Sequence, residues 1–385
     1  MIVSLIIVFV VLLIFIIDWI PKLNTWQSRV KIGQFPSDID WQNKITATSI
    51  KWLHQTPTIK LTDNKRLIII DILKGNYKKT AIQHWQQAAL VLGLTQHIVA
   101  TNDEKAREKV NAFFETIFDA SGNWKTPPKE IDSVILAYAL FNCSWIIQSN
   151  YKPAYDYCYQ LLLHLKGEDG TIAYRKHNPD YRYVDTIGFI CPFLMTYGVV
   201  FQNEEAVQLA VRQIISFNDF GMLPNHNVPC HAYSVKTNLP SGLFGWGRGL
   251  GWYAIGLIDS WKITPNNHPD KERLTQSVLS FSAMILKFQN KNGSWNWQIL
   301  YDKSQTDSSV TATLAYFLAS TASIPEIAEV SKNAKEKAIA YLKSVTRRDG
   351  ATDLSQGDTK GIGVYSQEFN ILPFTQGFCL RAITS

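Results

Sequence analysis

ASGNW at residues 120–124 and EDGTIAY at residues 168–174 are the first two of five similar turns that decide the predicted fold. Each turn is polar before a glycine, follows a stretch of helical spacing, and precedes another helix after a short connector. The glycines are spaced by 48, 51, 72 and 57 residues, at Gly122, Gly170, Gly221, Gly293 and Gly350. A period of about 50 residues is typical of a repeated pair of helices with its loops. The turns therefore predict an all-α fold.

Two architectures can be built from five or six such helical pairs. The pairs can stack as an open solenoid, or they can close into a toroid of inner and outer helices. Several long stretches of helical spacing, such as residues 131–147 and 187–200, are predominantly apolar. Inner helices of a closed ring are buried all round and require that composition. We therefore predict a closed α/α toroid over residues 42–385.

The N-terminal segment is far more apolar than the rest of the chain. Residues 1–17 read MIVSLIIVFVVLLIFII, with Ser4 as the single polar side chain. This length predicts a transmembrane anchor at residues 1–20, followed by a connector at residues 21–41. A cleaved signal peptide is the alternative, but no basic residue precedes the run and no A-x-A site follows it. A buried core helix is disfavoured by the strong hydrophobicity.

The charges after the apolar run predict an orientation. Lys22, Arg29 and Lys31 all follow it, and no Lys or Arg precedes it. Because basic residues tend to remain on the cytoplasmic side, the large domain is expected in the cytoplasm.

Composition and missing motifs exclude several function classes. The net charge of +6 is dispersed without a basic tract, which argues against nucleic acid and weakly favours a small anionic substrate. The five cysteines are odd in number and have no CxxC spacing, which disfavours zinc and a disulfide framework. There is no GxGxxG, GK[ST], HExxH or GxSxG motif. We therefore expect no metal and no nucleotide cofactor.

GWGRGLGW at residues 245–252 is the most unusual local segment. It places Arg248 between Trp246 and Trp252, with a glycine at every second position. Each glycine weakens a strand, and costs a helix interior about 1 kcal/mol, so we predict a loop held close to a ligand. Tryptophan faces beside a fixed cation suit a sugar ring that carries a carboxylate. Arg248 either binds that carboxylate or braces the loop, and the two flanking tryptophans favour binding.

His231, in PCHAY shortly before this segment, has two interpretations of equal weight. It either hydrogen-bonds a substrate or is an ordinary loop histidine.

Two aspartates open apolar helices in similar contexts, Asp132 in KEIDSVILAYALF and Asp185 in YRYVDTIGFICPFLM. One interpretation is that both simply accept backbone N–H groups at helix starts. In a toroid, however, inner helices begin at one rim, so both carboxylates are expected to converge on a central cavity. Helix-start hydrogen bonds lower a carboxyl pKa, whereas a general acid needs it raised. Burial by Tyr181, Tyr183 and Phe189 would raise the pKa of Asp185.

Three motifs together resemble a known group of enzymes. YVDTIGFICPFL at residues 183–194, HAY at 231–233 and WGRGLGW at 246–252 are similar in order and spacing to glycoside hydrolase families 88 and 105. These are the unsaturated glucuronyl and rhamnogalacturonyl hydrolases, and the likeness covers most of residues 80–320. The resemblance implies an (α/α)6 barrel of six helical hairpins.

The resemblance also implies a reaction and its residues. Asp185 matches the general acid/base and Asp132 the second aspartate of the site. The expected substrate-binding positions are His231, Trp246, Arg248 and Trp252. The acid protonates C4 of a C4–C5 unsaturated uronyl group, water adds at C5, and the resulting hemiketal opens to release the aglycone. One carboxyl group performs both proton transfers, so the usual displacement by two carboxylates is not needed. The implied substrate is an anionic oligosaccharide, and no metal takes part.

Other features depart from the family pattern. Ser234 stands where an acidic residue often follows HAY, Leu250 where Asn or Met is common, and residues 363–380 match poorly. These departures leave the glycan open and keep an inactive, membrane-tethered glycan-binding protein as one alternative.

A terpene cyclase is the second alternative, because FQNKNGSW at residues 288–295 has the Q-x3-G-x-W spacing of those α/α barrel enzymes. Their acidic DxDD and DDxxD motifs are missing.

Overall fold

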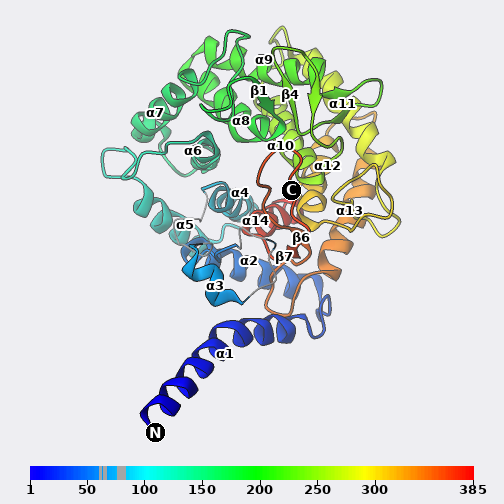
Figure 1. Ribbon diagram of the computed structural model, residues 1–385. Coiled ribbons are helices and arrows are strands. Elements are labelled where there is room, and N and C mark those ends of the chain that lie inside the picture. The colour runs from blue at the N-terminus through cyan, green and yellow to red at the C-terminus, as the bar shows by residue number, and fades with distance from the viewer. Residues whose placement is uncertain (60–62, 64–66, 76–83) are drawn as a thin grey trace.

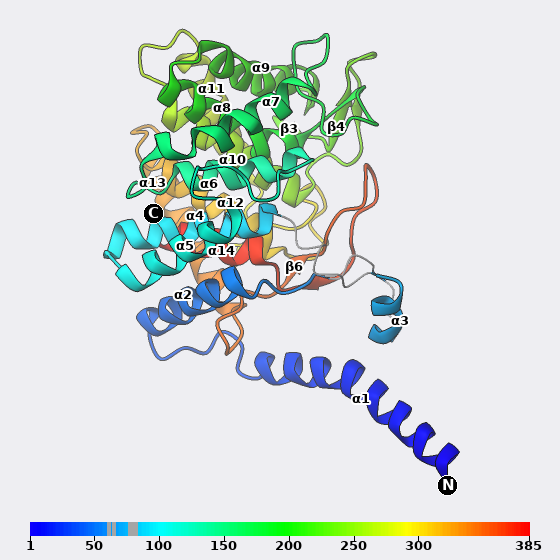
Figure 2. The same ribbon diagram turned by 90° about the vertical axis from the view of Figure 1, so that its left-hand side faces the viewer.

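The computed structural model describes residues 1–59, 63, 67–75 and 84–385, and its main body is a closed ring of helical hairpins (Figures 1 and 2). The remaining residues of the predicted 42–385 barrel lie outside the described ones. Inner helices pack in sequence order around the ring, and the last returns to the first. They are α4 (His84–Thr101), α6 (Val134–Phe141), α8 (Val184–Phe201), α10 (Gly247–Ile263), α12 (Ser308–Thr321) and α14 (Pro373–Ile383).

An outer helix accompanies each inner one. Five of them follow their inner partners along the chain, whereas α2 precedes the barrel and packs on α14 and α4. The outer helices are α2 (Asp38–His54), α5 (Glu104–Ile117), α7 (Lys152–Leu163), α9 (Glu204–Phe220), α11 (Lys271–Lys287) and α13 (Ala328–Ser344). The predicted six-hairpin α/α barrel is therefore confirmed as a mostly helical fold, and the open solenoid is excluded.

Burial explains which helix of each pair lies inside. Every residue of α6 is buried, because its whole sequence is apolar apart from one tyrosine hydroxyl. On α5 the buried residues are Ala106, Val110, Phe113 and Phe114, which form one stripe at helical spacing. A helix with a single apolar stripe can cover the ring but cannot occupy its interior.

Four of the five repeat turns have the same geometry. Gly122, Gly170, Gly293 and Gly350 all have φ between 75° and 89°, a region that favours glycine. In each turn the glycine N–H donates to the carbonyl three residues earlier. Gly221 differs, because it ends α9 with a φ of −104°.

Short strands cover one end of the ring and were not predicted from the sequence (Figure 2). A three-stranded antiparallel sheet has the order β1-β4-β5, and two further hairpins pair β2 with β3 and β6 with β7. The strands are β1 (Tyr181–Tyr183), β2 (Met222–Leu223), β3 (Val228–Pro229), β4 (Ala232–Ser234), β5 (Pro240–Ser241), β6 (Ser355–Gln356) and β7 (Phe369–Asn370). Two short single-turn helices are also present, η2 (Ile131–Ser133) and η3 (Gln148–Tyr151).

The glycine-rich segment at residues 245–252, expected to be a loop, instead begins inner helix α10 at Gly247. The glycines serve close packing. A Cβ added to Gly247 would lie 3.1 Å from the carbonyl oxygen of Asn296, and one added to Gly251 would lie 2.6 Å from Oγ1 of Thr313. The low helix propensity of glycine is offset here because neighbouring chain segments approach the helix closely.

Helix α1 (Ile2–Arg29) extends away from the barrel as one continuous helix, past the predicted boundary at residue 20 (Figure 1). Among the described residues, α1 and α8 are long and apolar enough to cross a membrane, but α8 is largely buried in the ring. The apolar part of α1 is exposed. Asp18 ends this part and accepts a hydrogen bond from the N–H of Ile68 at the start of α3 (Ile68–Leu73).

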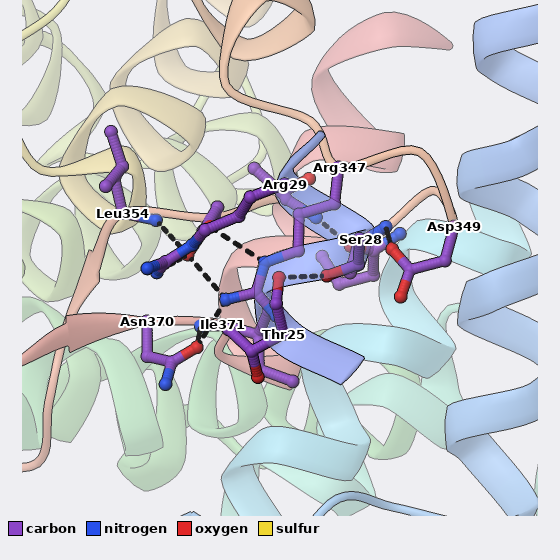
Figure 3. A network of polar contacts seen from close by, with 12 residues as sticks. Thr25, Ser28, Arg29, Arg347, Asp349, Leu354, Asn370 and Ile371 are labelled. Atoms are coloured by element: carbon purple, nitrogen blue, oxygen red, sulfur yellow. Dashed lines mark hydrogen bonds and ion pairs between the residues drawn. The ribbon is translucent and has the colours of Figure 1, made fainter. Parts of the chain in front are cut away.

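The last turn of α1 is fixed to the barrel through a buried carboxylate. Nε of Arg29 lies 2.6 Å from Oδ2 of Asp353, and Nε of Arg347 lies 2.7 Å from the same oxygen. The carbonyl of Ser28 accepts the N–H of Arg348 at 2.9 Å. Burial alone would raise the pKa of Asp353, but the hydrogen bonds of both arginines hold it below its usual value. Figure 3 shows Arg29 and Arg347 side by side in this network.

We expect Arg29→Ala to release the end of α1 from the barrel. The substitution removes one of the two arginines that pair with Asp353, and Arg347 remains. The unfolding free energy should therefore fall by only about 1 kcal/mol. Backbone amides of residues 25–33 should exchange hydrogen faster with solvent, as measured by mass spectrometry. Arg348→Ala is the matched control, because it removes an exposed arginine from the neighbouring turn. Equal exchange in the two variants would contradict this assignment.

Candidate active site

Strand pairing brings together two predicted residues that are distant in sequence. β1 runs antiparallel to β4 with Tyr183 opposite Ala232, and the N–H of Val184 donates to the carbonyl of His231 at 2.9 Å. This register places Nε2 of His231 3.7 Å from Oδ2 of Asp185. That distance is longer than a hydrogen bond, although the two groups face each other.

A pocket of about 260 Å³ opens beside this pair. Five of the six predicted site residues line it, namely Asp185, His231, Trp246, Arg248 and Trp252. The other lining residues are Trp85, Tyr174, Arg175, His177, Tyr183, Phe189, Asp358, Thr359, Lys360 and Gly361. Aromatic walls with several convergent charges are typical of a site for a polar small molecule.

Asp132, the sixth predicted residue, is not among the lining residues. Its Oδ2 accepts a hydrogen bond of 2.9 Å from Nη2 of Arg175, which does line the pocket. The guanidinium of Arg175 lies 3.8 Å from the ring centre of Tyr174 and also pairs with Glu130 at 3.4 Å. Asp132 therefore contacts the pocket wall through Arg175, and its direct convergence with Asp185 on one cavity stays a prediction. Asp132 lies in η2, directly before the start of inner helix α6.

Asp185 has the electrostatic environment of an acid that works near neutrality. Burial raises its pKa to about 7, opposed by its own backbone N–H and by Arg248, and reinforced by Asp358. Its Oδ2 is buried and has no hydrogen-bond partner among the described residues. Hydrogen bonds at the helix start and burial act in opposite directions on the pKa of Asp185, and burial has the larger effect. Tyr183 and Phe189 contribute to this burial as pocket walls.

His231 is a neutral group in this setting. Burial lowers its pKa to about 4. Its ring lies 4.6 Å from the Trp246 ring and 5.5 Å from the Tyr183 ring, measured between centroids. Nδ1 lies 3.0 Å from the hydroxyl of Tyr365. An uncharged imidazole can donate or accept one hydrogen bond at each nitrogen but adds no positive charge to the pocket.

Arg248 braces the chain as well as lining the pocket. Nη1 donates to the carbonyl of Gln356 at 2.7 Å, and Nη2 donates to the carbonyl of Gly357. Nε1 of Trp246 donates to Oε1 of Gln356 at 2.9 Å. The bracing role that the sequence left open is therefore present, and any substrate contact must use the remaining face of the guanidinium.

Trp252 belongs to an aromatic cluster at the base of the pocket. Its ring centre lies 4.3 Å from Phe189, 4.6 Å from Phe374 and 5.7 Å from Trp85. These residues come from α8, α14 and the first turn of α4, so the wall is made by inner helices from several hairpins.

Sequence reasoning missed two groups of lining residues. Tyr174, Arg175 and His177 follow the repeat turn at Gly170, and their aromatic and basic character was a usable signal. Residues 358–361 come from the long loop between β6 and β7, where no motif or period marks them. Among the described residues, no group of three or more His, Cys, Asp or Glu side chains is arranged to hold a metal.

The segment that suggested a terpene cyclase braces a repeat turn. Nε2 of Gln289 donates to the carbonyls of Gly293 and Ala334 at 3.0 and 2.8 Å. Nε1 of Trp295 donates to the carbonyl of Ile285 at 2.8 Å. The Q-x3-G-x-W spacing is therefore explained by the packing of one hairpin on the next.

Comparisons with known proteins agree with this architecture. Residues 60–385 match the family model of Glycosyl Hydrolase Family 88. The unsaturated rhamnogalacturonyl hydrolase YesR of Bacillus subtilis is 21% identical over 298 residues, which cover 75% of this chain and 83% of that protein.

Solved structures of related proteins share the fold. A possible member of the GH105 family from Klebsiella pneumoniae superposes with a TM-score of 0.75 at 17% identity, covering 91% of this chain and 93% of the other. An unsaturated glucuronyl hydrolase specific for heparin superposes with a TM-score of 0.66 at 16% identity, covering 89% of this chain and 96% of the other.

Proposed function

This chain belongs to Glycosyl Hydrolase Family 88, and from that membership we propose that it hydrolyses oligosaccharides ending in an unsaturated uronyl residue, with Asp185 as the acid. The observation that carries the proposal is the Asp185 carboxyl. It is buried in an aromatic pocket, has a pKa of about 7, and presents an oxygen without a partner among the described residues. A carboxyl group poised near the working pH is what proton transfer to carbon requires.

The proposed reaction needs one proton donor and one water molecule. Protonated Asp185 gives its proton to C4 of the C4–C5 double bond, and positive charge develops at C5 and the ring oxygen. The carboxylate so formed then takes a proton from a water molecule as that water adds to C5. The resulting hemiketal opens and releases the aglycone. Asp185 returns to its protonated form, so no second carboxylate has to act as a nucleophile.

The charges around the pocket support an anionic substrate. Arg175, Arg248 and Lys360 all line it. A uronyl carboxylate placed among these cations is favoured by its charge, and the faces of Trp246 and Trp252 provide flat apolar contacts for the sugar ring.

Asp132 acts in this proposal as a positioning residue. Its hydrogen bond to Arg175 fixes a guanidinium that faces the pocket, while Tyr174 supports the same group from its ring face. Removal of Asp132 therefore disturbs substrate placement, whereas removal of Asp185 abolishes the proton donor.

The activity itself is tested with a panel of unsaturated disaccharides produced by polysaccharide lyases. Turnover removes the conjugated double bond, so ultraviolet absorbance falls with time. We expect at least one uronyl disaccharide of the panel to be consumed. If the folded protein binds such disaccharides but leaves the absorbance of all of them unchanged, the glycan-binding alternative replaces hydrolysis.

The rate should depend on pH through Asp185. Because its pKa is about 7, the group is protonated and able to donate below that pH. We expect kcat/KM to fall about tenfold for each pH unit well above 7, with little loss between pH 5 and 6 from this group. Initial rates over pH 5–9 measure the profile. A rate that stays flat up to pH 9 would contradict Asp185 as the acid.

We further propose that α1 is an uncleaved, single-pass membrane anchor over residues 1–20 and that residues 42–385 form the catalytic domain. The exposed apolar surface of α1 supports this, because such a surface is unfavourable in water. Lys22, Arg29 and Lys31 favour the cytoplasmic side for the barrel. The side of the membrane on which the barrel lies can be tested with Leu239→Cys, which introduces an exposed cysteine. Its labelling by a membrane-impermeant thiol reagent is compared between sealed and opened cells.

Deletion of residues 1–17 is expected to convert a membrane-bound protein into a soluble one. The shortened chain keeps Arg29 and its contact with Asp353, so the barrel and its turnover should be unchanged. Sedimentation of membranes followed by detection of the protein in pellet and supernatant measures the change. A shortened chain that still sediments with membranes, or a full chain that does not, would contradict the anchor.

A further inference from the structure

Tyr365 lies beside the pocket, in contact with His231, and has no part in the proposed reaction. It lies in the loop between β6 and β7, in the stretch that matches the family pattern poorly. Its hydroxyl oxygen lies 3.0 Å from Nδ1 of His231 and 2.9 Å from the backbone nitrogen of Leu243. Its ring is 5.4 Å from that of Trp246 between centroids. The hydroxyl is therefore held in one place by chain segments far apart in sequence.

The protons of these contacts can be assigned. The N–H of Leu243 can only donate, so the Tyr365 oxygen accepts this bond. The single phenolic proton is then available to point at Nδ1 of His231, 3.0 Å away. The reverse arrangement needs another acceptor for that proton, and the described residues give the hydroxyl no other hydrogen-bond partner. Nδ1 is therefore the acceptor.

We infer that Tyr365 is a positioning residue that keeps neutral His231 in the tautomer with its proton on Nε2, so that an N–H group faces Asp185. This inference rests on the proposed function for its catalytic meaning, but not for the tautomer itself. Nε2 is the nitrogen that lies 3.7 Å from the unpartnered Oδ2 of Asp185. Tyr183 packs edge-on against the same imidazole, and the charged groups that act on Asp185 include Arg248, Asp358 and Arg175.

The tautomer decides what His231 does when the proton leaves Asp185. With hydrogen on Nε2, a small approach of the imidazole to Asp185 gives the newly formed carboxylate a hydrogen-bond donor. This bond stabilises the state after proton transfer. With hydrogen on Nδ1, the Nε2 lone pair would face the carboxylate and repel it, or would draw the proton of Asp185 to itself. Fixing the tautomer thus directs the acidic proton to substrate rather than to histidine.

Nitrogen-15 NMR of the full-length protein in lipid, labelled at histidine, tests the tautomer at pH 7. The His231 signals are assigned by their loss in His231→Gln. We expect Nε2 of His231 to carry the proton and Nδ1 to show the shift of an acceptor nitrogen. In Tyr365→Phe a mixture of tautomers should appear. Tyr183→Phe is the matched control, because it removes a hydroxyl from the other aromatic ring beside His231 and should leave the tautomer unchanged.

The kinetic test uses the same variant. Tyr365→Phe should lower kcat about tenfold with KM within twofold of the wild type, because the lost hydrogen bond acts on the proton transfer. Protonation of Nδ1 in the wild-type protein would overturn the inference, whether or not any disaccharide is turned over. Absence of turnover with the expected tautomer would instead count against the proposed function alone.

Discussion

Asp185→Asn is expected to lower kcat on an unsaturated uronyl disaccharide by about 10³-fold. The amide keeps the size of the carboxyl group but has no acidic proton to give to C4. Oδ2 of Asp185 is buried and has no hydrogen-bond partner among the described residues, so the substitution breaks no bond to this oxygen. The variant should therefore fold normally and lose little stability. Ultraviolet assays of the variant and wild type under identical conditions measure the loss.

Binding separates this result from a general defect. The affinity of the variant for the disaccharide, measured calorimetrically, should stay within a few-fold of the wild type. Asp156→Asn is a suitable control, because Asp156 lies partly exposed on outer helix α7 and pairs with Lys152. Its activity should be unchanged. Retention of more than a tenth of the wild-type rate in Asp185→Asn would exclude this carboxyl as the proton donor.

Gly377→Val is expected to cost at least about 4 kcal/mol of unfolding free energy and to prevent stable closure of the barrel. Helix α14 meets α4 at this glycine, and their contact closes the inner ring. A Cβ at position 377 would lie 2.0 Å from the carbonyl oxygen of Ala89, and one at Gly93 would lie 2.2 Å from the carbonyl of Gly377. Backbone atoms on both sides leave nothing that can move aside easily.

The measurement is the midpoint of urea unfolding of the full-length protein in detergent. For a variant too unstable to purify, it is the yield of folded protein. Gly361→Val is the matched control, because a Cβ at Gly361 meets nothing within 4 Å and its φ lies outside the positive region. The control should keep the wild-type midpoint. An unchanged midpoint for Gly377→Val would show that the helices can separate at this point without cost.

The architecture could be predicted from sequence because its signals are local and repeated. A glycine at positive φ is needed at each of four turns, so the positions of Gly122, Gly170, Gly293 and Gly350 report the hairpins directly. Closure of the ring was predicted from its apolar helices, whereas the number of six hairpins was implied by the family resemblance. The number of turns alone is compatible with either five or six helical pairs. The pairing of the first outer helix with the last inner one has no local signature in the sequence.

The site was only partly predictable. Asp185 and His231 were found through motifs, but the strand register that joins them is a tertiary feature. The partners of Arg248 lie more than 100 residues away along the chain, as the 108-residue separation from Gln356 shows. The glycines of residues 245–252 indicate a loop when only their low helix propensity is considered. The chain segments that pack closely against them, and so require glycine, are not visible in the sequence.

A crystal structure of Asp185→Asn with an unsaturated uronyl disaccharide would show which sugar atom faces position 185. We expect the sugar ring to lie in the 260 Å³ pocket between Trp246 and Trp252, with C4 within about 3.5 Å of the side chain at position 185. A ring bound with its anomeric carbon, rather than C4, facing that side chain would contradict the proposed protonation, and so would a sugar bound outside the pocket.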